Sequence, residues 1–187
     1  IARAFQIPQL FLDQTVMENM LIAAASLKGR PSGFKALSSL PEAAEMERLR
    51  DLVGVKSYAE RKARELPEGQ RKLVDIALAL ALKPKLLLMD EPTSGVASSE
   101  KLGIMDILTT ALAKEKVTSV FVEHDMDMVE RYANRVAVWN MGKIQKVGTP
   151  AEVLRAETLS EFYGVSVTVM HSPDGPVAVV PRRSSGE

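Results

Sequence analysis

Two acidic side chains follow an apolar run in the middle of the chain, where Asp90 and Glu91 come directly after Leu86–Met89. A short apolar run without alternation is typical of a parallel strand that is buried on both faces. The carboxyl edge of such a sheet is where α/β folds place their ligands. There Asp90 could hold Mg²⁺ through its water shell, and Glu91 could polarise an attacking water. Taken alone, the pattern also fits a strand that simply enters a polar loop.

Three other features could join this pair of acids. His124 follows a second short apolar run and stands 34 positions after Asp90. The loop Leu66–Gln70 precedes an apolar helix expected at about 69–82, whose first amide groups and dipole favour an anion. Gln6 stands near the start of the chain. Each has an ordinary structural explanation when taken alone. His124 could be a polar residue at a strand end, the loop could be a plain helix start, and Gln6 could be a surface glutamine.

The elements that must position these residues follow from local signals. Strands are expected at Leu86–Met89 and Val117–Val122, with a helix at Ser99–Lys114 between them. The order strand, helix, strand, helix predicts an α/β fold with a parallel sheet. The helix between the strands should bury one apolar stripe. Its expected members are Leu102, Met105, Leu108 and Leu112.

Three sequences of the form Ser/Thr-x-x-Glu predict helix starts through a reciprocal capping box. They are Thr15–Glu18, Ser39–Glu42 and Thr149–Glu152. Gly54 stands where the second of these helices needs a left-handed residue to end it. The Gly-, Pro- and Ser-rich stretch Lys28–Ser39 is expected to be a mobile loop.

The last third of the chain predicts two antiparallel hairpins. Arg135–Trp139 and Ile144–Val147 flank the turn sequence Asn-Met-Gly-Lys, and the alternating valines of Val165–Val180 flank Pro-Asp-Gly. The residues Arg182–Glu187 beyond them are expected to be disordered.

Composition excludes several classes of protein. The chain has 187 residues and no cysteine, which excludes a disulfide scaffold, thiolate metal sites and thiol catalysis. Lysine plus arginine and aspartate plus glutamate number 24 each, so net charge gives no reason to expect nucleic acid or anionic lipid as a partner. No apolar run approaches the roughly 20 residues that span a bilayer, and no secretory signal is expected at the start. Because the chain opens with Ile1 rather than Met, we expect a piece of something longer.

The order and spacing of these motifs together resemble the ATP-binding subunits of ABC transporters, from Ile1 to about Val165. The resemblance implies a partial P-loop ATPase domain of the α/β class, with a parallel sheet core and a helical signature subdomain. It implies Glu91, His124 and Gln6 as catalytic residues, and Asp90 and Gln6 as Mg²⁺ ligands. The implied nucleotide-binding residues belong to the signature loop and the D-loop. They are Leu66, Pro67, Glu68, Gly69, Gln70, Ser94 and Gly95.

The residues within the motifs look most like those of the branched-chain amino acid uptake subfamily. The segments that carry this likeness are Phe5–Phe11, Pro92–Val96 and Val122–Asp127. The tail segments Glu161–Val165 and His171–Pro176 look more like those of siderophore, haem or cobalamin importers. The transported solute therefore stays open between an amino acid and a metal-chelate compound.

The chain departs from the family pattern in three places. The Gly-rich Walker A loop, which lies upstream of the Q-loop in this family, is absent from this sequence, so the chain has no cradle of its own for the phosphates. In the signature loop Pro67 replaces serine and Glu68 replaces glycine, which removes a hydroxyl and adds an acid near the phosphates. Ala97 stands where the D-loop usually has Asp or Asn.

The implied protein uses ATP and Mg²⁺ to drive solute import as a cytoplasmic dimer on the inner face of the membrane. Its partners would be transmembrane permease subunits and a second ATP-binding subunit, with no nucleic acid. The expected segments are the Q-loop segment 1–14, the helical subdomain 15–65, the ATPase core 66–150 and the C-terminal part 151–187. One alternative is a degenerate module that docks on a transporter without hydrolysing ATP. Another is a soluble ABC ATPase of DNA repair or translation. Such a protein is expected to contain a long coiled coil or a second cassette, and neither is recognised in this sequence.

Overall fold

The computed structural model describes residues 1–4, 8–27, 43–170 and 178–181. The chain divides into two compact units, Ile1–Val122 and Glu123–Glu187. The four segments expected from the sequence stay a prediction beside this division.

A parallel three-stranded sheet lies at the centre of the first unit. Its strands β1 (Ala2–Ala4), β2 (Leu86–Asp90) and β3 (Thr118–Val122) pair in the order β1-β2-β3. Ala4 lies opposite Met89, and Asp90 lies opposite Val122, so all three strands end at one edge. The expected α/β fold with a parallel sheet is confirmed.

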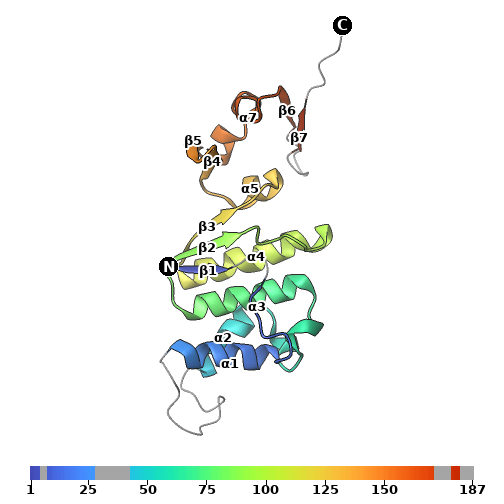
Figure 1. Ribbon diagram of the computed structural model, residues 1–187, viewed down its shortest axis with the longest axis vertical. Coiled ribbons are helices and arrows are strands. Elements are labelled where there is room, and N and C mark those ends of the chain that lie inside the picture. The colour runs from blue at the N-terminus through green and yellow to red at the C-terminus, as the bar shows by residue number, and fades with distance from the viewer. Residues whose placement is uncertain (5–7, 28–42, 171–177, 182–187) are drawn as a thin grey trace. The chain divides into compact units, whose positions relative to one another are not determined.

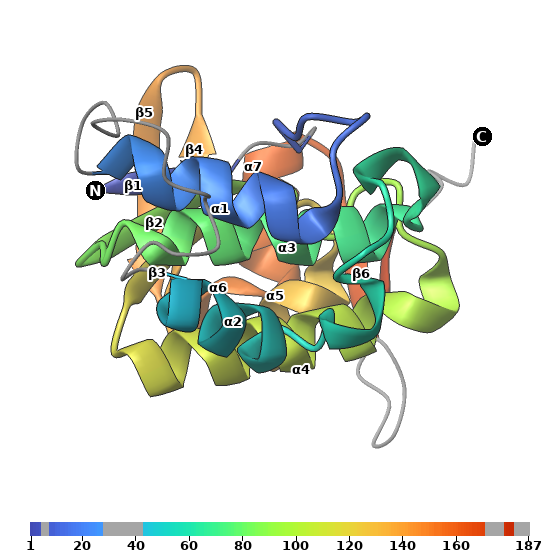
Figure 2. The same ribbon diagram turned by 90° about the horizontal axis from the view of Figure 1, so that it is seen from below.

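The described residues of the first unit form four α-helices besides this sheet (Figures 1 and 2). They are α1 (Val16–Leu27), α2 (Ala43–Leu52), α3 (Glu68–Ala81) and α4 (Ser98–Glu115), with the 3₁₀ turns η2 (Lys56–Tyr58) and η3 (Ala63–Glu65) between α2 and α3. Helix α3 contacts β1 and α4 and also contacts α1 and α2 (Figure 1). Because it has neighbours on several sides, most of its residues are buried, as its unusually apolar sequence predicts.

The local signals for helix ends are confirmed where the structure describes them. The backbone N–H of Glu18 donates to Thr15 Oγ1 at 3.1 Å, and the N–H of Thr15 donates to Glu18 Oε2 at 2.7 Å. Gly54 has φ +74°, and the N–H of the following Val55 donates to the Arg50 carbonyl at 3.1 Å, which closes α2. The expected loop and helix start at 28–42 lie outside the described residues.

Two expectations about burial are wrong. Val120 and Val122 on β3 are 53% and 62% exposed, although the apolar run predicted burial on both faces. The residue types of a strand cannot reveal which of its faces is covered, because the covering segments are distant in sequence. Leu102 lies at the margin of the buried stripe of α4 and is exposed. The buried members are Ile104, Met105, Leu108, Ala111 and Leu112.

The described part of the second unit contains three short helices and two hairpins. The helices are α5 (Met126–Tyr132), α6 (Pro150–Val153) and α7 (Ala156–Tyr163). Strands β4 (Val136–Asn140) and β5 (Lys143–Gly148) pair antiparallel, as do β6 (Val167–Met170) and β7 (Ala178–Pro181).

Both expected hairpins of the second unit are confirmed. Met141 and Gly142 have φ +49° and +73°, the backbone of a two-residue turn that matches the strand twist. The turn of the second hairpin and the residues 182–187 lie outside the described residues. Among the residues that are described, none of the helices is both long and apolar enough to cross a bilayer.

Candidate functional site

Asp90 and Glu91 lie at the carboxyl edge of the parallel sheet. Asp90 is the last residue of β2, and its side chain is 43% exposed. Arg3 Nη2 on β1 lies 4.0 Å from Asp90 Oδ2. The backbone N–H of Glu91 donates to the carbonyl of Val122 at 3.0 Å, which ties this residue to the end of β3. The first acid is therefore accessible at the edge, and the second is fixed through its backbone.

Glu91 adopts a left-handed backbone, with φ +44°. For a residue other than glycine this conformation costs about 1–2 kcal/mol. The Glu91 carbonyl accepts two hydrogen bonds, from the N–H of Ser94 at 3.0 Å and from Nζ of Lys72 at 3.0 Å. A hydrogen bond to a charged group contributes about 1.5–3 kcal/mol, which is enough to offset the strain. Lys72 was not among the residues that sequence reasoning selected.

The signature loop Leu66–Gln70 opens α3 and packs tightly at its glycine. A Cβ atom at Gly69 would lie 3.0 Å from Ile104 Cδ1 and 3.7 Å from Val96 Cγ1. Packing alone therefore explains why glycine occupies this position, whether or not a ligand binds there. Pro67 is the N-cap residue of α3 and makes no side-chain capping bond.

Glu68 of the signature loop lies against the D-loop Ser94–Ala97. A Cβ atom at Gly95 would lie 3.4 Å from Glu68 Cγ, and Gly95 itself has φ +76°. Arg71 Nη2 forms an ion pair with Glu68 Oε2 at 2.5 Å, so the acid that replaces the family glycine is partly neutralised. Within the first unit the structure thus brings the signature loop and the D-loop together, in the same chain as Glu91.

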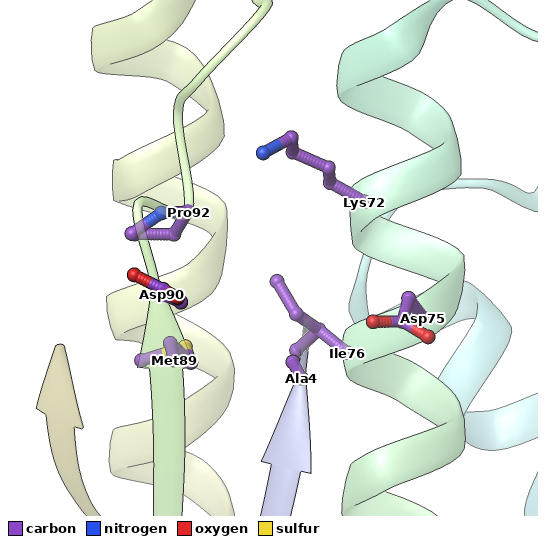
Figure 3. Close-up of a pocket in the computed structure, with 7 residues that line it drawn as sticks. All are labelled: Ala4, Lys72, Asp75, Ile76, Met89, Asp90 and Pro92. Atoms are coloured by element: carbon purple, nitrogen blue, oxygen red, sulfur yellow. The ribbon is translucent and has the colours of Figure 1, made fainter. Parts of the chain in front are cut away.

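A small cavity lies between α3 and the end of β2 (Figure 3). Figure 3 shows Lys72 extending from α3 toward the segment that follows β2. Asp75 lines the same cavity, and the backbone N–H of Gln9 donates to Asp75 Oδ1 at 3.4 Å. The complete lining is Ala4, Lys72, Asp75, Ile76, Met89, Asp90 and Pro92. A buried ammonium and two carboxylates therefore share the wall beside the sheet edge.

The acidic residues at this edge do not form a ready cage for a metal ion. In the part of the chain that the structure describes, no cluster of three or more His, Asp or Glu side chains is arranged to hold one. Asp90 is a single accessible carboxylate, which suits Mg²⁺ because this ion keeps several of its waters and needs few protein ligands. The residues present fit a largely hydrated magnesium ion better than a permanent metal centre.

Gln70, the last residue of the signature loop, carries a buried amide oxygen. Among the described residues, Oε1 of this side chain has no hydrogen-bond partner. A buried acceptor of this kind usually meets a donor group or water. The signature loop thus offers one acceptor, Gln70 Oε1, in addition to the N–H donors at the start of α3.

His124 belongs to the second unit, where Glu123 holds the local backbone. Glu123 Oε1 accepts the N–H of His124 at 2.9 Å and the N–H of Asp125 at 3.1 Å, and it lies 3.7 Å from His124 Nδ1. The side chain of His124 is 74% exposed. It lines a pocket with Tyr163 and Val165 of the same unit. The catalytic role expected for His124 stays a prediction, and Gln6 lies outside the described residues.

Comparison with known proteins places this chain in a family. The family described as "ABC transporter" matches residues 1–94, more than half of the chain. The chain belongs to the ABC transporter family. It is 33% identical over 170 residues to the energy-coupling factor transporter ATP-binding protein EcfA2 of Caldanaerobacter subterraneus subsp. tengcongensis, with 89% of this chain and 56% of that protein covered.

Two further similarities agree with this membership. The spermidine/putrescine import ATP-binding protein PotA 1 of Pseudomonas aeruginosa is 32% identical over 185 residues, covering 94% of this chain and 48% of that protein. The structure of cbiO1 from Clostridium perfringens, part of the ABC transporter complex cbiONQ, matches with a TM-score of 0.71 at 27% identity. It covers 86% of this chain and 61% of that one. The chain spans about half the length of the curated relatives it matches.

Proposed function

We propose that the full-length ABC protein binds Mg²⁺ and ATP and hydrolyses ATP to drive solute import. The observation that carries the proposal is the pair Asp90 and Glu91 at the carboxyl edge of the sheet, with the Glu91 carbonyl held by Lys72 and Ser94. Catalysis of phosphoryl transfer is mostly positioning and charge stabilisation, so a glutamate whose backbone is held at this edge suits it.

The two acids take different parts in this reaction. Asp90, accessible at the end of β2, would hold Mg²⁺ through the water shell of the ion. The ion neutralises charge on the nucleotide phosphates when it is bound. Glu91 accepts the proton of the attacking water as general base. His124 holds the γ-phosphate or the water in place, and Gln6 senses Mg²⁺ and the membrane partner.

The signature loop faces the nucleotide held by a second ATP-binding subunit. The start of α3 supports this part of the proposal, because the helix dipole and the first backbone N–H groups attract an anion there. Pro67 gives these amides no side-chain cap, and Arg71 offsets the charge of Glu68. Ser94 and Gly95 lie beside this loop and complete the proposed nucleotide-binding surface.

The proposed partners are permease subunits on the inner face of the cell membrane. Phe11 and Leu12 are 60% and 49% exposed at the end of the Q-loop segment and offer an apolar contact for such a subunit. The buried Asn19 holds Phe11 by hydrogen bonds to its backbone at both N–H and carbonyl. This fixed apolar tip is the support for a docking role.

The proposed solute is a branched-chain or other amino acid, because the residues of the motifs around Gln6, Gly95 and His124 resemble those of the amino acid uptake subfamily. The named relatives point in other directions, since PotA 1 is named for spermidine and putrescine. Uptake assays with the matching permease, comparing leucine, spermidine and a metal-chelate compound, decide among them. Amino acid uptake that depends on Glu91 is the expected result.

A docking module without hydrolysis is the second candidate function. Pro67, Glu68 and Ala97 favour it, because each weakens the contact that the family makes to the opposite nucleotide. Its prediction differs plainly from the first, since a docking module would bind the permease without releasing phosphate from ATP.

Phosphate release by the purified full-length protein tests the proposal. A general base contributes about 10²–10⁴-fold, so Glu91→Gln should reduce turnover by at least about 10²-fold. Glu100→Gln is the matched control, because Glu100 is an exposed glutamate on α4. Equal turnover in both variants would remove Glu91 from the role of base, and no turnover in the unmodified protein would favour the docking module.

A further inference from the structure

Lys72 is buried in a place that is unfavourable for a cation. Only 3% of the residue is exposed, although lysine is almost never fully buried unless its charge has partners. It is the fifth residue of α3, and cations are stabilised near the C-terminus of a helix rather than near its N-terminus. A buried ammonium here therefore calls for a specific reason.

The contact that Lys72 makes supplies this reason. Its Nζ atom lies 3.0 Å from the Glu91 carbonyl, across 19 positions of sequence. Asp75 and Asp90 line the same cavity (Figure 3). The ammonium thus contacts the backbone carbonyl of Glu91, the residue whose side chain is the proposed catalytic base.

The backbone of Glu91 needs support from outside its own loop. Its φ of +44° is held by the bond from Ser94, which belongs to the same turn and moves with it. The N–H of Glu91 is tied to Val122 on β3. Lys72 ties the carbonyl to α3, a helix packed against β1 and three other helices. With both peptide groups fixed, the direction in which the Glu91 side chain leaves the backbone is fixed as well.

We propose that Lys72 is a positioning residue for Glu91, which aims the general base through the Glu91 carbonyl. The inference rests on the proposed function, in which Glu91 is that base. Lys72 also follows the signature loop Leu66–Gln70 by two residues on the same helix. The position of Glu91 therefore depends on the position of the helix that begins with the signature loop.

Steady-state ATP hydrolysis by the full-length protein tests this role. Lys72→Met keeps the length and apolar stem of the side chain but removes the donor. Because misplacement by about 1 Å can cost about 10²-fold, kcat should fall about tenfold to a hundredfold, while KM for ATP changes less than about threefold. Lys72→Arg keeps a charged donor and should recover part of the lost kcat. Lys114→Met, at an exposed lysine of α4, is the matched control and should keep the kcat of the unmodified protein.

A double substitution separates positioning from a general loss of structure. If Lys72 acts through Glu91, then Lys72→Met added to Glu91→Gln should leave the residual turnover unchanged, because the base is already gone. A further loss of turnover in the double variant, or a normal kcat in Lys72→Met alone, would overturn the inference. A rise in KM equal to the fall in kcat would also overturn it. An unmodified protein without turnover would instead refute the proposed function itself.

Discussion

Pro67 opens α3 without the side-chain acceptor that most helix starts provide. The family pattern has a serine at this position, whose hydroxyl would cap the helix and also face a nucleotide. The structure shows a regular helix from Glu68 onward despite the substitution. The departure therefore removes a hydrogen-bonding group without removing the element that carries it.

Replacing this proline tests what the missing hydroxyl does. Relative to Pro67→Ala, Pro67→Ser should raise the free energy of unfolding by about 1 kcal/mol, because only serine restores the cap. One more hydrogen bond to a charged phosphate is worth about 1.5–3 kcal/mol, or about tenfold to a hundredfold in ATP-driven dimerisation. Urea unfolding and sedimentation of the full-length protein with ATP measure the two effects.

The comparison with alanine is the control, since both variants lose the proline ring and gain an N–H group. Serine and alanine variants with equal dimerisation would show that no phosphate approaches this position. The companion change, Glu68→Gly, should also strengthen dimerisation, but modestly, because Arg71 already pairs with Glu68.

At the scale of elements, a buried asparagine fixes the segment that precedes α1. Asn19 is 2% exposed; its Nδ2 donates to the carbonyls of Phe11 at 3.1 Å and Thr15 at 2.9 Å. Its Oδ1 accepts the N–H of Phe11 at 2.8 Å. The exposed apolar tip at Phe11 thus depends on one side chain of the following helix.

Asn19→Ala should lower the free energy of unfolding by about 1–3 kcal/mol, since backbone groups of Phe11 and Thr15 lose their partners. Urea unfolding of the full-length protein measures it, with Asn134→Ala at an exposed site of the second unit as control. A loss no larger than that of the control would mean that water replaces these bonds without cost.

The capping box of α6 predicts a dependence of stability on pH. The N–H and hydroxyl of Thr149 donate to Glu152 Oε2 at 2.8 and 3.0 Å, and these bonds hold the pKa of Glu152 below its ordinary value of 4.5. A carboxylate with a lowered folded-state pKa contributes stability above pH 4.5 and loses it as the pH falls through the folded-state pKa. Arg48 lowers the pKa of Glu45 in the same direction, through their side-chain hydrogen bond.

Glu152→Gln should therefore be less stable than the unmodified protein at pH 7, and the difference should shrink below pH 4.5. Unfolding curves in urea between pH 7 and pH 3 measure this change. A difference that stays constant over the whole range would show that the charge of Glu152 takes no part in the cap.

How far sequence predicts this molecule depends on how local the interaction is. The capping pair Thr15 and Glu18 and the acids that follow Leu86–Met89 are readable, because each signal lies within a few residues. The contact of Lys72 with the Glu91 carbonyl was not predictable in the same way. It joins an apolar helix to a loop 19 positions away, and only the fold brings the two together. A lysine in the middle of the apolar sequence of α3 was the available signal.

At the scale of the whole molecule, the two units each carry part of the proposed machinery. The first unit holds Asp90, Glu91, the signature loop and the D-loop, and the second holds His124. Family membership and the fold are shared with ATP-binding proteins of transporters, whereas Pro67 and Glu68 depart from the signature pattern that the sequence resembles. We propose that Glu91, in the first unit, is the base of a nucleotide site and not a structural residue.

The most direct measurement is the nucleotide retained by the full-length Glu91→Gln protein after incubation with ATP and Mg²⁺, together with its mass in sedimentation. The amide keeps the shape of the carboxylate but cannot accept the proton of the attacking water. The account predicts that turnover is lost while ATP stays bound in a dimer that persists. Loss of ATP binding in step with loss of turnover would contradict it.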